Sequence, residues 1–257
     1  MHLLLVNDDG FDSPLLRMLC SAAAGRGHRV TVAAPDRQQS AKSHAFTVAD
    51  PLTVKPGRME GAAEAWRVCG TPVDCSRLGL MELARDADLV ISGINDGWNI
   101  GLATYVSGTV GAAREAAFIQ GKAVAVSLEP GASEETAAFA ADFAVRTAER
   151  MAESSLPPMC VCSINVPALP PSALREAVFC PINCRMYRDA YERRVSPRGR
   201  LYFWLGPETP DDAPDKGTDL DLLQQGHITC TLLTPPRDVC FHCDSLLPPL
   251  REDAPCV

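Results

Sequence analysis

Long hydrophobic runs are missing from this 257-residue chain. No stretch approaches the roughly 18 apolar residues that a bilayer-spanning helix needs. The first apolar run, Leu3–Val6, is followed at once by Asn7, Asp8 and Asp9. It lacks both the cationic start and the length of a signal peptide. We therefore expect a cytoplasmic protein with no membrane partner.

Excess basic charge is missing as well. The chain has 24 Lys and Arg against 32 Asp and Glu, which gives a formal net charge of −8 and a pI of about 5.1. A protein that coats nucleic acid without regard to sequence is normally basic, so a stable nucleic-acid complex is not expected. A small phosphorylated substrate remains compatible, because one local site can be positive inside an acidic protein.

Several catalytic motifs are absent. The sequence contains no G-x-G-x-x-G, no G-x-x-x-x-G-K-[ST] and no G-x-S-x-G, which argues against a standard dinucleotide site, a P-loop and a serine nucleophile elbow. The five histidines are dispersed and form no metalloprotease pair. Only His44 lies near a candidate site loop, where a solvated position and a catalytic or substrate role both remain open.

The 11 cysteines do not resemble a disulfide framework, because they are odd in number and scattered along a long chain. We expect mostly reduced thiols. Only the segment Cys240–Cys243, which includes His242, has metal-like spacing. Cys230 and Cys256 lack the paired spacing that would complete a four-ligand zinc site. The pattern favours an ordinary C-terminal tail.

The N-terminal residues predict a strand–helix–strand unit. Leu3–Val6 is a short continuous apolar run typical of a strand buried on both faces. A helix is predicted over 14–24, with Ser13 as its N-cap, and a second strand over 29–34. A unit of this length is typical of a right-handed parallel crossover.

The same alternation continues to about residue 166. Helices are predicted over 71–84, 108–120 and 133–153, and strands over 88–92, 123–128 and 159–166. The pattern predicts an α/β, Rossmann-like fold with a mostly parallel sheet and helices on both faces.

The alternation of predicted strands and helices is less regular after residue 180. A hairpin is predicted over 187–205, then a loop rich in Pro and Asp over 206–217, a short helix over 219–225 and a strand over 228–233. We therefore divide the chain into a core, residues 1–180, and a second segment, residues 181–257.

Polar residues follow three of the predicted strands. Asp8 and Asp9 follow the first, Ser40 lies in the loop after the second, and Asn95 follows the strand over 88–92. The carboxyl ends of parallel strands meet at one edge of a sheet, where ligands bind. Carboxylate, hydroxyl and amide oxygens suit Mg²⁺ or Mn²⁺ better than zinc. Asp8 and Asp9 could equally cap a helix or fill a turn, so the metal role stays open here.

A phosphate site is suggested by two neighbouring features. The segment 93–101 is rich in Gly and Asn, and Ser107-Gly108-Thr109 opens the helix over 108–120. Glycine allows close backbone approach to a ligand, and a helix N-terminus binds anions. A flexible linker and plain N-capping by Ser107 and Thr109 are the alternatives.

These strand-end residues resemble the stationary-phase survival protein SurE family. Four blocks carry the resemblance, and weaker similarity continues in the same order to about residue 235. The blocks are Val6-Asn7-Asp8-Asp9-Gly10, then Ala34-Pro35-Asp36-Arg37 with Ser40 and Ser43, then Ser92-Gly93-Ile94-Asn95-Asp96-Gly97-Trp98-Asn99, and Ser107-Gly108-Thr109-Val110.

The resemblance implies a 5′/3′-nucleotidase, a metal-dependent phosphomonoester hydrolase that releases phosphate from nucleoside monophosphates. By motif position, one divalent ion, Mg²⁺ or Mn²⁺, is held by Asp8, Asp9, Ser40 and Asn95. Asn99, Ser107, Gly108 and Thr109 line the phosphate pocket. Residues 181–257 would supply a hairpin and an exchanged C-terminal arm that form dimers or tetramers. Our mechanistic hypothesis is attack by a metal-activated water, with Asp8 or Asp9 accepting its proton.

The chain departs from the family pattern at four positions. Leu15 and Ala41 stand where glycine is usual, Val106 where tyrosine is usual, and His227 where an aromatic residue is common. None of these departures removes a proposed ligand. They bear on loop geometry and substrate preference.

Two other classes remain as alternatives. A receiver-like signalling domain also has an acidic pair after its first strand, but the phosphoacceptor position here contains Asn95, with Asp96 as the only nearby substitute, and the chain is about twice as long as such a domain. A catalytically silent nucleotide-binding protein would show metal-dependent affinity without turnover.

Overall fold

The central strand β1 (His2–Val6) organises the sheet. All five of its residues are buried, and it pairs in parallel with β2 (Arg29–Pro35) and β5 (Leu89–Asp96). A strand that is apolar on both faces requires a packed layer on each side. The computed structural model describes residues 1–184, 190–206 and 214–235. Within these ranges, no helix has the length and apolar character needed to cross a membrane.

Nine strands form the main sheet, in the order β3-β4-β2-β1-β5-β6-β7-β11-β8. Pairing is parallel except between β3 and β4 and between β7 and β11. The predicted mostly parallel sheet is therefore confirmed. The remaining strands are β3 (Thr53–Pro56), β4 (Glu64–Cys69), β6 (Lys122–Leu128), β7 (Cys160–Val166), β8 (Arg175–Phe179) and β11 (His227–Leu233).

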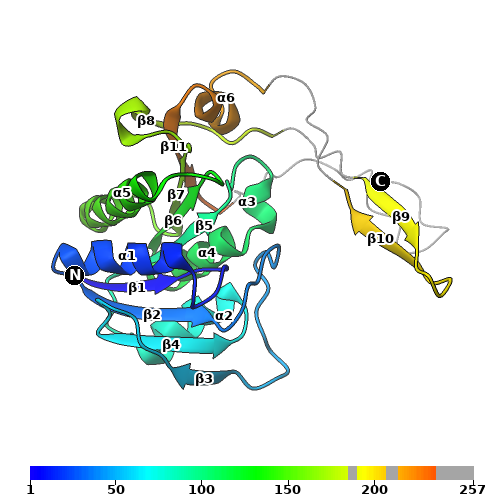
Figure 1. Cartoon of the computed structure of the whole chain (residues 1–257). Helices are drawn as coiled ribbons and strands as arrows, with labels where there is room; N and C mark the ends of the chain where they lie inside the picture. Colours follow the sequence, from blue (N-terminus) through cyan, green and yellow to red (C-terminus); the bar gives the residue numbers. More distant parts are fainter. Residues whose placement is uncertain (185–189, 207–213, 236–257) are drawn as a thin grey trace, which may run out of the picture.

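Helices cover both faces of the sheet (Figure 1). On one face, α1 (Pro14–Gly25) and α5 (Glu134–Glu153) pack over Leu3 and Leu5. On the other face, α2 (Pro72–Leu78) and α4 (Gly108–Gln120) pack over Leu4 and Val6. Alternate residues of β1 thus enter two separate cores, as the two-residue period of a strand requires.

The predicted N-caps lie where the sequence put them. Ser13 accepts a hydrogen bond from Leu16 N at 3.5 Å, and Ser133 accepts one from Thr136 N at 3.2 Å. The helix predicted over 71–84 is shorter than expected as an α-helix. It continues beyond Leu78 as a π-helical segment, Gly79–Leu83.

Two parts of the fold differ from the sequence prediction. The strand predicted over 88–92 continues to Asp96, with a register shift between Ser92 and Asn95, so the segment predicted as a loop from Gly93 begins as an irregular strand. An unpredicted short helix, α3 (Ala103–Val106), follows it.

β3 and β4 were also not predicted, because they are short and largely exposed and so lack a continuous apolar run.

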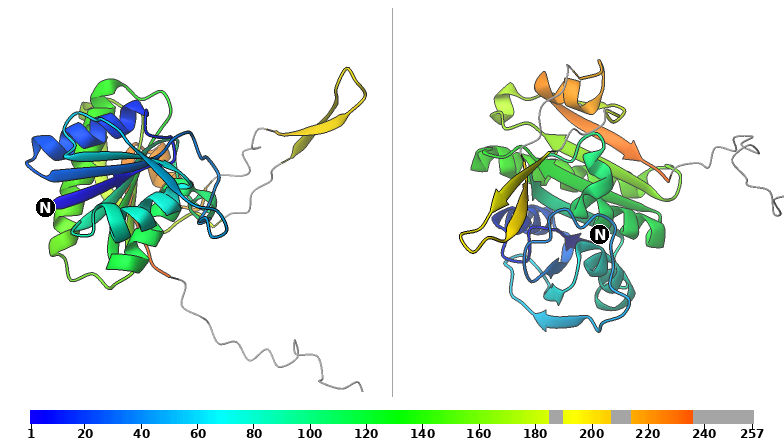
Figure 2. Two further views of the ribbon diagram at one scale, coloured as in Figure 1. Left: turned by 90° about the horizontal axis from the view of Figure 1, so that it is seen from below. Right: turned by 90° about the vertical axis from the view of Figure 1, so that its right-hand side faces the viewer.

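The hairpin β9 (Tyr191–Val195) and β10 (Leu201–Leu205) is antiparallel and stands away from the main sheet (Figure 2). The later strand β11, by contrast, belongs to the main sheet, and α6 (Asp219–Gln224) precedes it. The division of the chain after residue 180 stays a prediction. Residues 187–189 of the predicted hairpin and the cysteines of 240–256 lie outside the described residues.

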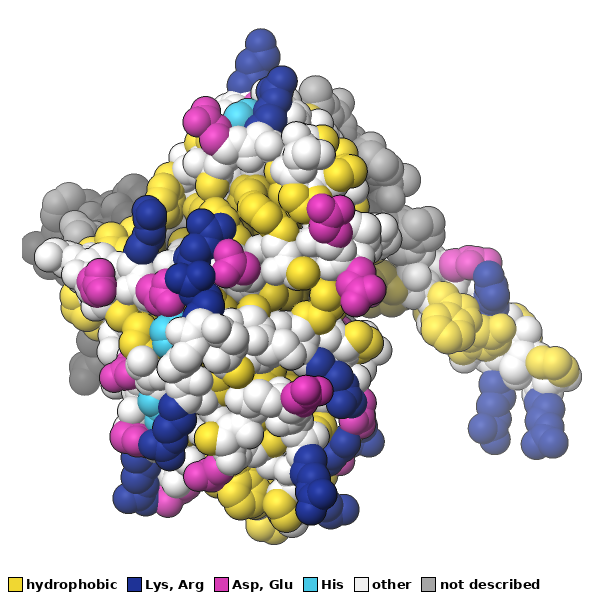
Figure 3. Space-filling model, turned by 60° about the vertical axis from the view of Figure 1, so that its left-hand side comes forward, with side chains coloured by type: hydrophobic (Ala, Val, Ile, Leu, Met, Phe, Trp, Pro, Cys, Tyr) yellow, Lys and Arg dark blue, Asp and Glu magenta, His cyan; other side chains and the backbone are white. Residues whose placement is uncertain are grey.

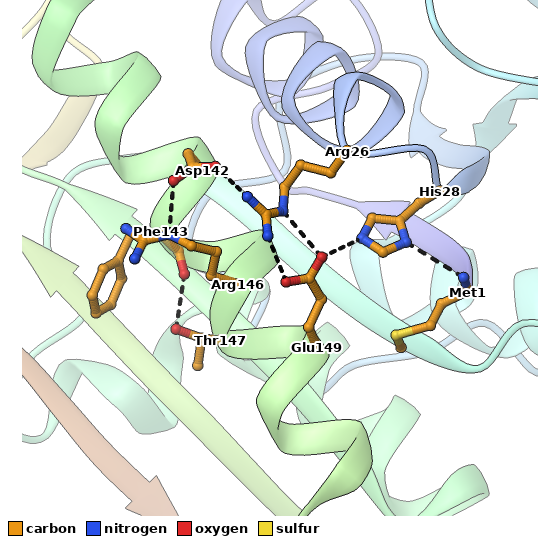
Figure 4. A network of polar contacts seen from close by, with 8 residues as sticks. All are labelled: Met1, Arg26, His28, Asp142, Phe143, Arg146, Thr147 and Glu149. Atoms are coloured by element: carbon orange, nitrogen blue, oxygen red, sulfur yellow. Dashed lines mark hydrogen bonds and ion pairs between the residues drawn. The ribbon is translucent and has the colours of Figure 1, made fainter.

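A polar network ties α1 to α5 on the surface (Figure 4). Glu149 accepts from Arg26 Nε at 3.0 Å and Nη2 at 2.8 Å, and it lies 2.9 Å from His28 Nε2. Asp142 accepts from both Arg26 and Arg146. Ion pairs this accessible to solvent usually contribute about 1 kcal/mol or less.

We expect stability to depend on the β1 core far more than on this network. Leu5→Ala should lower the free energy of unfolding by roughly 2–5 kcal/mol, because it leaves a cavity in a fully buried site. Glu149→Gln should lower it by less than about 1 kcal/mol, and less still in high salt. Urea denaturation checks both values. An equal loss for the two variants would contradict this assignment.

Candidate metal and phosphate site

Asp8 lies at the carboxyl end of β1, between the start of α4 and the loop after β2. Its side chain is buried, and Oδ1 accepts a hydrogen bond from Thr109 Oγ1 at 2.5 Å. Its carbonyl oxygen accepts from Gln39 N at 2.7 Å. The structure therefore brings together segments that are a hundred residues apart in sequence, as the strand-end argument predicts.

Asp9 faces β5 and the start of α1. Its Oδ2 accepts from Asp96 N at 3.2 Å. It lines a cavity of about 430 Å³ together with Gln38, Asp96 and Leu15. Asp9 is only half-buried, so it is the more accessible of the two neighbouring carboxylates.

Within the described residues, the two carboxylates have no ion-pair partner. Burial, and to a smaller extent the charge of neighbouring Asp9, raise the pKa of Asp8 to about 6 against the opposing effect of the hydrogen bond from Thr109. Burial also raises the pKa of Asp9. No salt bridge reaches either residue from the described part of the chain. An uncompensated acidic pair of this kind favours a bound cation.

The donor atoms fit a hard divalent ion. Asn95 donates from Nδ2 to Gly97 O at 2.7 Å, which fixes the orientation of the amide. Its Oδ1 is then available as a metal ligand. Beside the pair, Asn7 Oδ1 is buried without a hydrogen-bond partner. Among the described residues, no group of three or more His, Cys, Asp or Glu is placed to hold a metal. An ion here would thus depend on neutral oxygens as well as on the two carboxylates.

The N-terminus of α4 lies against Asp8. Ser107 is the N-cap and accepts from Val110 N at 3.1 Å. A Cβ on Gly108 would lie 3.0 Å from Asp8 Oδ2, so glycine permits this close approach. The hydroxyl of Thr109 donates to Asp8, and the backbone N–H of Ser107 donates to Ala103 O at 3.0 Å. The N–H of Gly108 and the hydroxyl of Ser107 are therefore the groups of this turn that suit an anion.

Asn99 is held by two neighbouring strands. Its N donates to Asn165 Oδ1 on β7 and its Nδ2 to Ser127 Oγ on β6, both at 2.8 Å. Asn165 Nδ2 donates back to Asn99 O at 3.2 Å. The side chain is buried, and its position is fixed by the sheet rather than by the loop alone.

Ser40 is exposed, in a loop that docks on α3 and α4. Ser43 N donates to Val106 O at 3.0 Å, and Ser43 Oγ donates to Tyr105 O at 2.7 Å. A Cβ on Gly111 would lie 2.3 Å from Ser43 O. The loop is therefore anchored beside the site, although the structure shows no contact between Ser40 and the carboxylates.

His44 serves as a further anchor of this loop. Its Nε2 lies 2.7 Å from Glu115 Oε2, and its ring stacks on Phe118 with centroids 5.5 Å apart. Both partners belong to α4. These contacts give His44 a structural position rather than the free solvated one that the sequence left open.

Sequence reasoning missed two buried carboxylates around the site. Asp74 accepts from Thr47 N, Thr47 Oγ1 and Thr71 N at 2.7–2.9 Å, which holds the far end of the Ser40 loop. Asp219 accepts from the backbone N of Gly101. In the sequence, each aspartate follows a Thr that precedes its helix. This pattern indicates a helix start, but it does not identify the distant backbone groups that the aspartate binds.

The fold and the site together define a doubly wound α/β protein with two neighbouring carboxylates at the carboxyl edge of its sheet. The model of the family described as Survival protein SurE matches residues 3–189. The chain is 41% identical over 234 residues to the 5′-nucleotidase SurE of Nitratidesulfovibrio vulgaris (strain DP4), covering 91% of this chain and 93% of that one. It is 39% identical over 246 residues to that of Thermosynechococcus vestitus, covering 91% of each.

A solved structure is similar as well. The crystal structure of the SurE protein from Aquifex aeolicus gives a TM-score of 0.76 at 28% sequence identity, over 91% of this chain and 93% of that chain. The chain belongs to the SurE family.

Asp8→Asn should remove metal binding without lowering the stability of the metal-free protein. In EDTA we expect the variant to melt at the wild-type temperature or above, because an amide avoids the cost of burying a charge, and Thr109 can still donate to its oxygen. Addition of Mg²⁺ or Mn²⁺ should stabilise the wild type, by about 2.7 kcal/mol at one hundred times the Kd, but not the variant. Differential scanning fluorimetry measures both.

Asp12→Asn is the matched control for this experiment, because Asp12 is exposed and pairs with Arg67 and Arg17 instead. It should keep the metal-induced shift. If Asp8→Asn also keeps the full shift, Asp8 does not hold the ion.

Proposed function

We propose that the protein is a metal-dependent nucleotidase that hydrolyses nucleoside monophosphates to release phosphate. The observation that carries this proposal is the buried Asp8, which neighbours Asp9 and lies against the N-terminus of α4. Two neighbouring carboxylates can bind a divalent ion, and the adjacent helix N-terminus can bind an anion. Together they suit a phosphomonoester that is held by a metal ion. The relatives described above bear the name 5′-nucleotidase.

The proposed ligands of the ion are Asp8, Asp9, Asn95 and Ser40, and we propose one Mg²⁺ or Mn²⁺. Ser40, which is exposed and does not contact the two carboxylates, would join them from its anchored loop. When bound, such an ion activates a water molecule for attack and neutralises charge on the phosphate oxygens. The all-oxygen donor set supports a hard cation over zinc.

The chain's own groups would position the substrate and handle its proton. The N–H group of Gly108 and the hydroxyl of Ser107 would hold the non-bridging oxygens of phosphate, together with Asn99. Asp8 is fixed by the hydroxyl of Thr109. Asp9 is the more accessible carboxylate, so it is the one that a water molecule can approach. We therefore place proton acceptance on Asp9.

A phosphate-release screen tests the proposal. Wild-type protein should release phosphate continuously from nucleoside monophosphates with Mg²⁺ or Mn²⁺, and not with EDTA. Asp8→Asn should lower kcat/KM by about a hundredfold or more, while Asp12→Asn should leave it unchanged.

Two results would contradict the nucleotidase proposal. Metal-dependent nucleotide binding without turnover would indicate the silent binding protein. Stoichiometric labelling by a small phosphodonor would indicate the receiver-like domain, although Asn95 cannot form the acyl phosphate.

We also propose that the hairpin associates with a second copy of the chain. Seven large apolar residues on β9 and β10 are exposed, and both faces of the ribbon carry them. Figure 3 shows apolar side chains on the hairpin beside arginines, away from the main body. The exposed set is Tyr191, Val195, Leu201, Tyr202, Phe203, Trp204 and Leu205.

Phe203→Glu tests this association. Phe203 lies opposite Arg193 in the hairpin, so glutamate keeps a favourable cross-strand pair while it removes an exposed aromatic ring. We expect a dimer or tetramer for the wild type by sedimentation velocity and a monomer for the variant. Val54→Glu, on exposed β3, is the control and should leave the mass unchanged. A monomeric wild type would refute the proposal.

The cytoplasmic placement also remains a proposal. Every cysteine in the described residues is a free thiol. This is the state that a reducing compartment maintains.

A further inference from the structure

Asp219 is a buried carboxylate that binds three backbone amides from three parts of the chain. It is 1% exposed at the start of α6. Oδ2 accepts from Gly101 N at 2.7 Å, and Oδ1 accepts from Asn183 N at 2.8 Å and Leu220 N at 2.9 Å. No cation pairs with it in the part of the chain that the structure describes. Its charge is therefore satisfied entirely by backbone N–H groups.

The contact lies where two backbone segments approach closely. Gly101 has φ +52, and a Cβ there would lie 2.6 Å from Asn183 O. Thr104 Oγ1 donates to Gly101 O at 2.8 Å, which continues the constraint into α3. The segment around Gly101 is thus held on both sides, and Asp219 supplies a charged contact to it.

This segment connects two parts of the proposed phosphate pocket. Asn99 precedes Gly101 by two residues and is fixed by Ser127 and Asn165. After Gly101, α3 leads directly to Ser107, the N-cap of α4. Asp219 therefore holds the midpoint between two anchored ends, each of which carries a group proposed to face phosphate.

We propose that Asp219 is a positioning residue for the phosphate pocket, which it sets through the backbone of Gly101. The inference rests on the proposed function for the role of the pocket. The coupling of the segments around Gly101, Asn183 and Asp219 can be tested without turnover. The carboxylate touches neither the carboxylate pair nor the proposed metal ligands, so its effect should fall on phosphate and not on the ion.

Asp219→Asn provides a selective change. Oδ1 accepts two hydrogen bonds and Oδ2 accepts one, so an asparagine keeps its carbonyl toward Asn183 and Leu220 and turns its NH₂ toward Gly101 N. The two donors then face each other, and the contact at Gly101 is lost. Asp221→Asn is the matched control, because Asp221 lies in the same helical turn, carries the same charge and, among the described residues, accepts from Gly217 N alone.

We expect Asp219→Asn to raise the KM for a nucleoside monophosphate and the Ki of inorganic phosphate together, by roughly tenfold. The half-saturating metal concentration should not change. A merely structural role would lower the active fraction, and therefore kcat, with KM and Ki unchanged. That pattern, or an equal effect of Asp221→Asn, would overturn the inference.

Hydrogen exchange gives a measurement that needs neither activity nor a stable variant. In wild-type protein with Mg²⁺ or Mn²⁺, inorganic phosphate should slow amide exchange together in the peptides that cover 97–107, 181–184 and 217–221. Protection of 97–107 alone would overturn the coupling. If phosphate protects all three peptides but no nucleoside monophosphate is hydrolysed, the proposed nucleotidase function fails while the positioning role of Asp219 stands.

Discussion

The burial of the Asp8 carboxylate at the end of β1, with half-buried Asp9 beside it, is the constraint on which the site depends. β1 is covered on both faces, so the residues that follow it emerge into a partly desolvated corner of the sheet. Water cannot fully screen Asp8 there, and its pKa rises to about 6. The buried charge is tolerated because the hydroxyl of Thr109 donates a hydrogen bond to Asp8 and because Gly108 allows the N-terminus of α4 to lie close to it. The remaining imbalance is what a cation corrects.

The surroundings of this corner are held mainly by side chains that bind backbone. Asp74, Asn165 and Asp219 each fix a loop by accepting from its N–H groups, and each comes from a different part of the chain. Such contacts give a loop the precision of the elements that flank it, since a backbone amide cannot move without losing a buried partner. A mobile surface loop could not present groups to phosphate with the same accuracy.

The sequence predicted the elements whose signals are local. The apolar run Leu3–Val6 and the caps Ser13 and Ser133 placed β1, α1 and α5 because their causes lie within a few residues. The position of Asp8 beside Thr109 also followed, since parallel strands end at one edge. The roles of these residues as ligands, and those of Ser40 and Asn95, stay predictions.

Other features could not be predicted because their causes are not local. β3 is fully exposed and β4 buries only Ala65 and Val68, so no continuous or alternating apolar pattern marked them. The irregular end of β5 depends on its pairing with β6. Asp219 meets Gly101 across more than a hundred residues, and neither residue carries a local sign of the other. His44 received its partner, Glu115, only from the docking of the loop on α4.

The place of β11 in the sheet also bears on the order in which the protein can assemble during synthesis. Among the described residues, β8 pairs only with β11, and β11 lies between β7 and β8. A ribosome therefore releases the whole hairpin before it releases the strand that joins β8 to the rest of the sheet. Until residues 227–233 emerge, the nascent chain presents the open edge of β7, and its apolar hairpin is already outside. Completion of the sheet therefore waits until β11 has been synthesised.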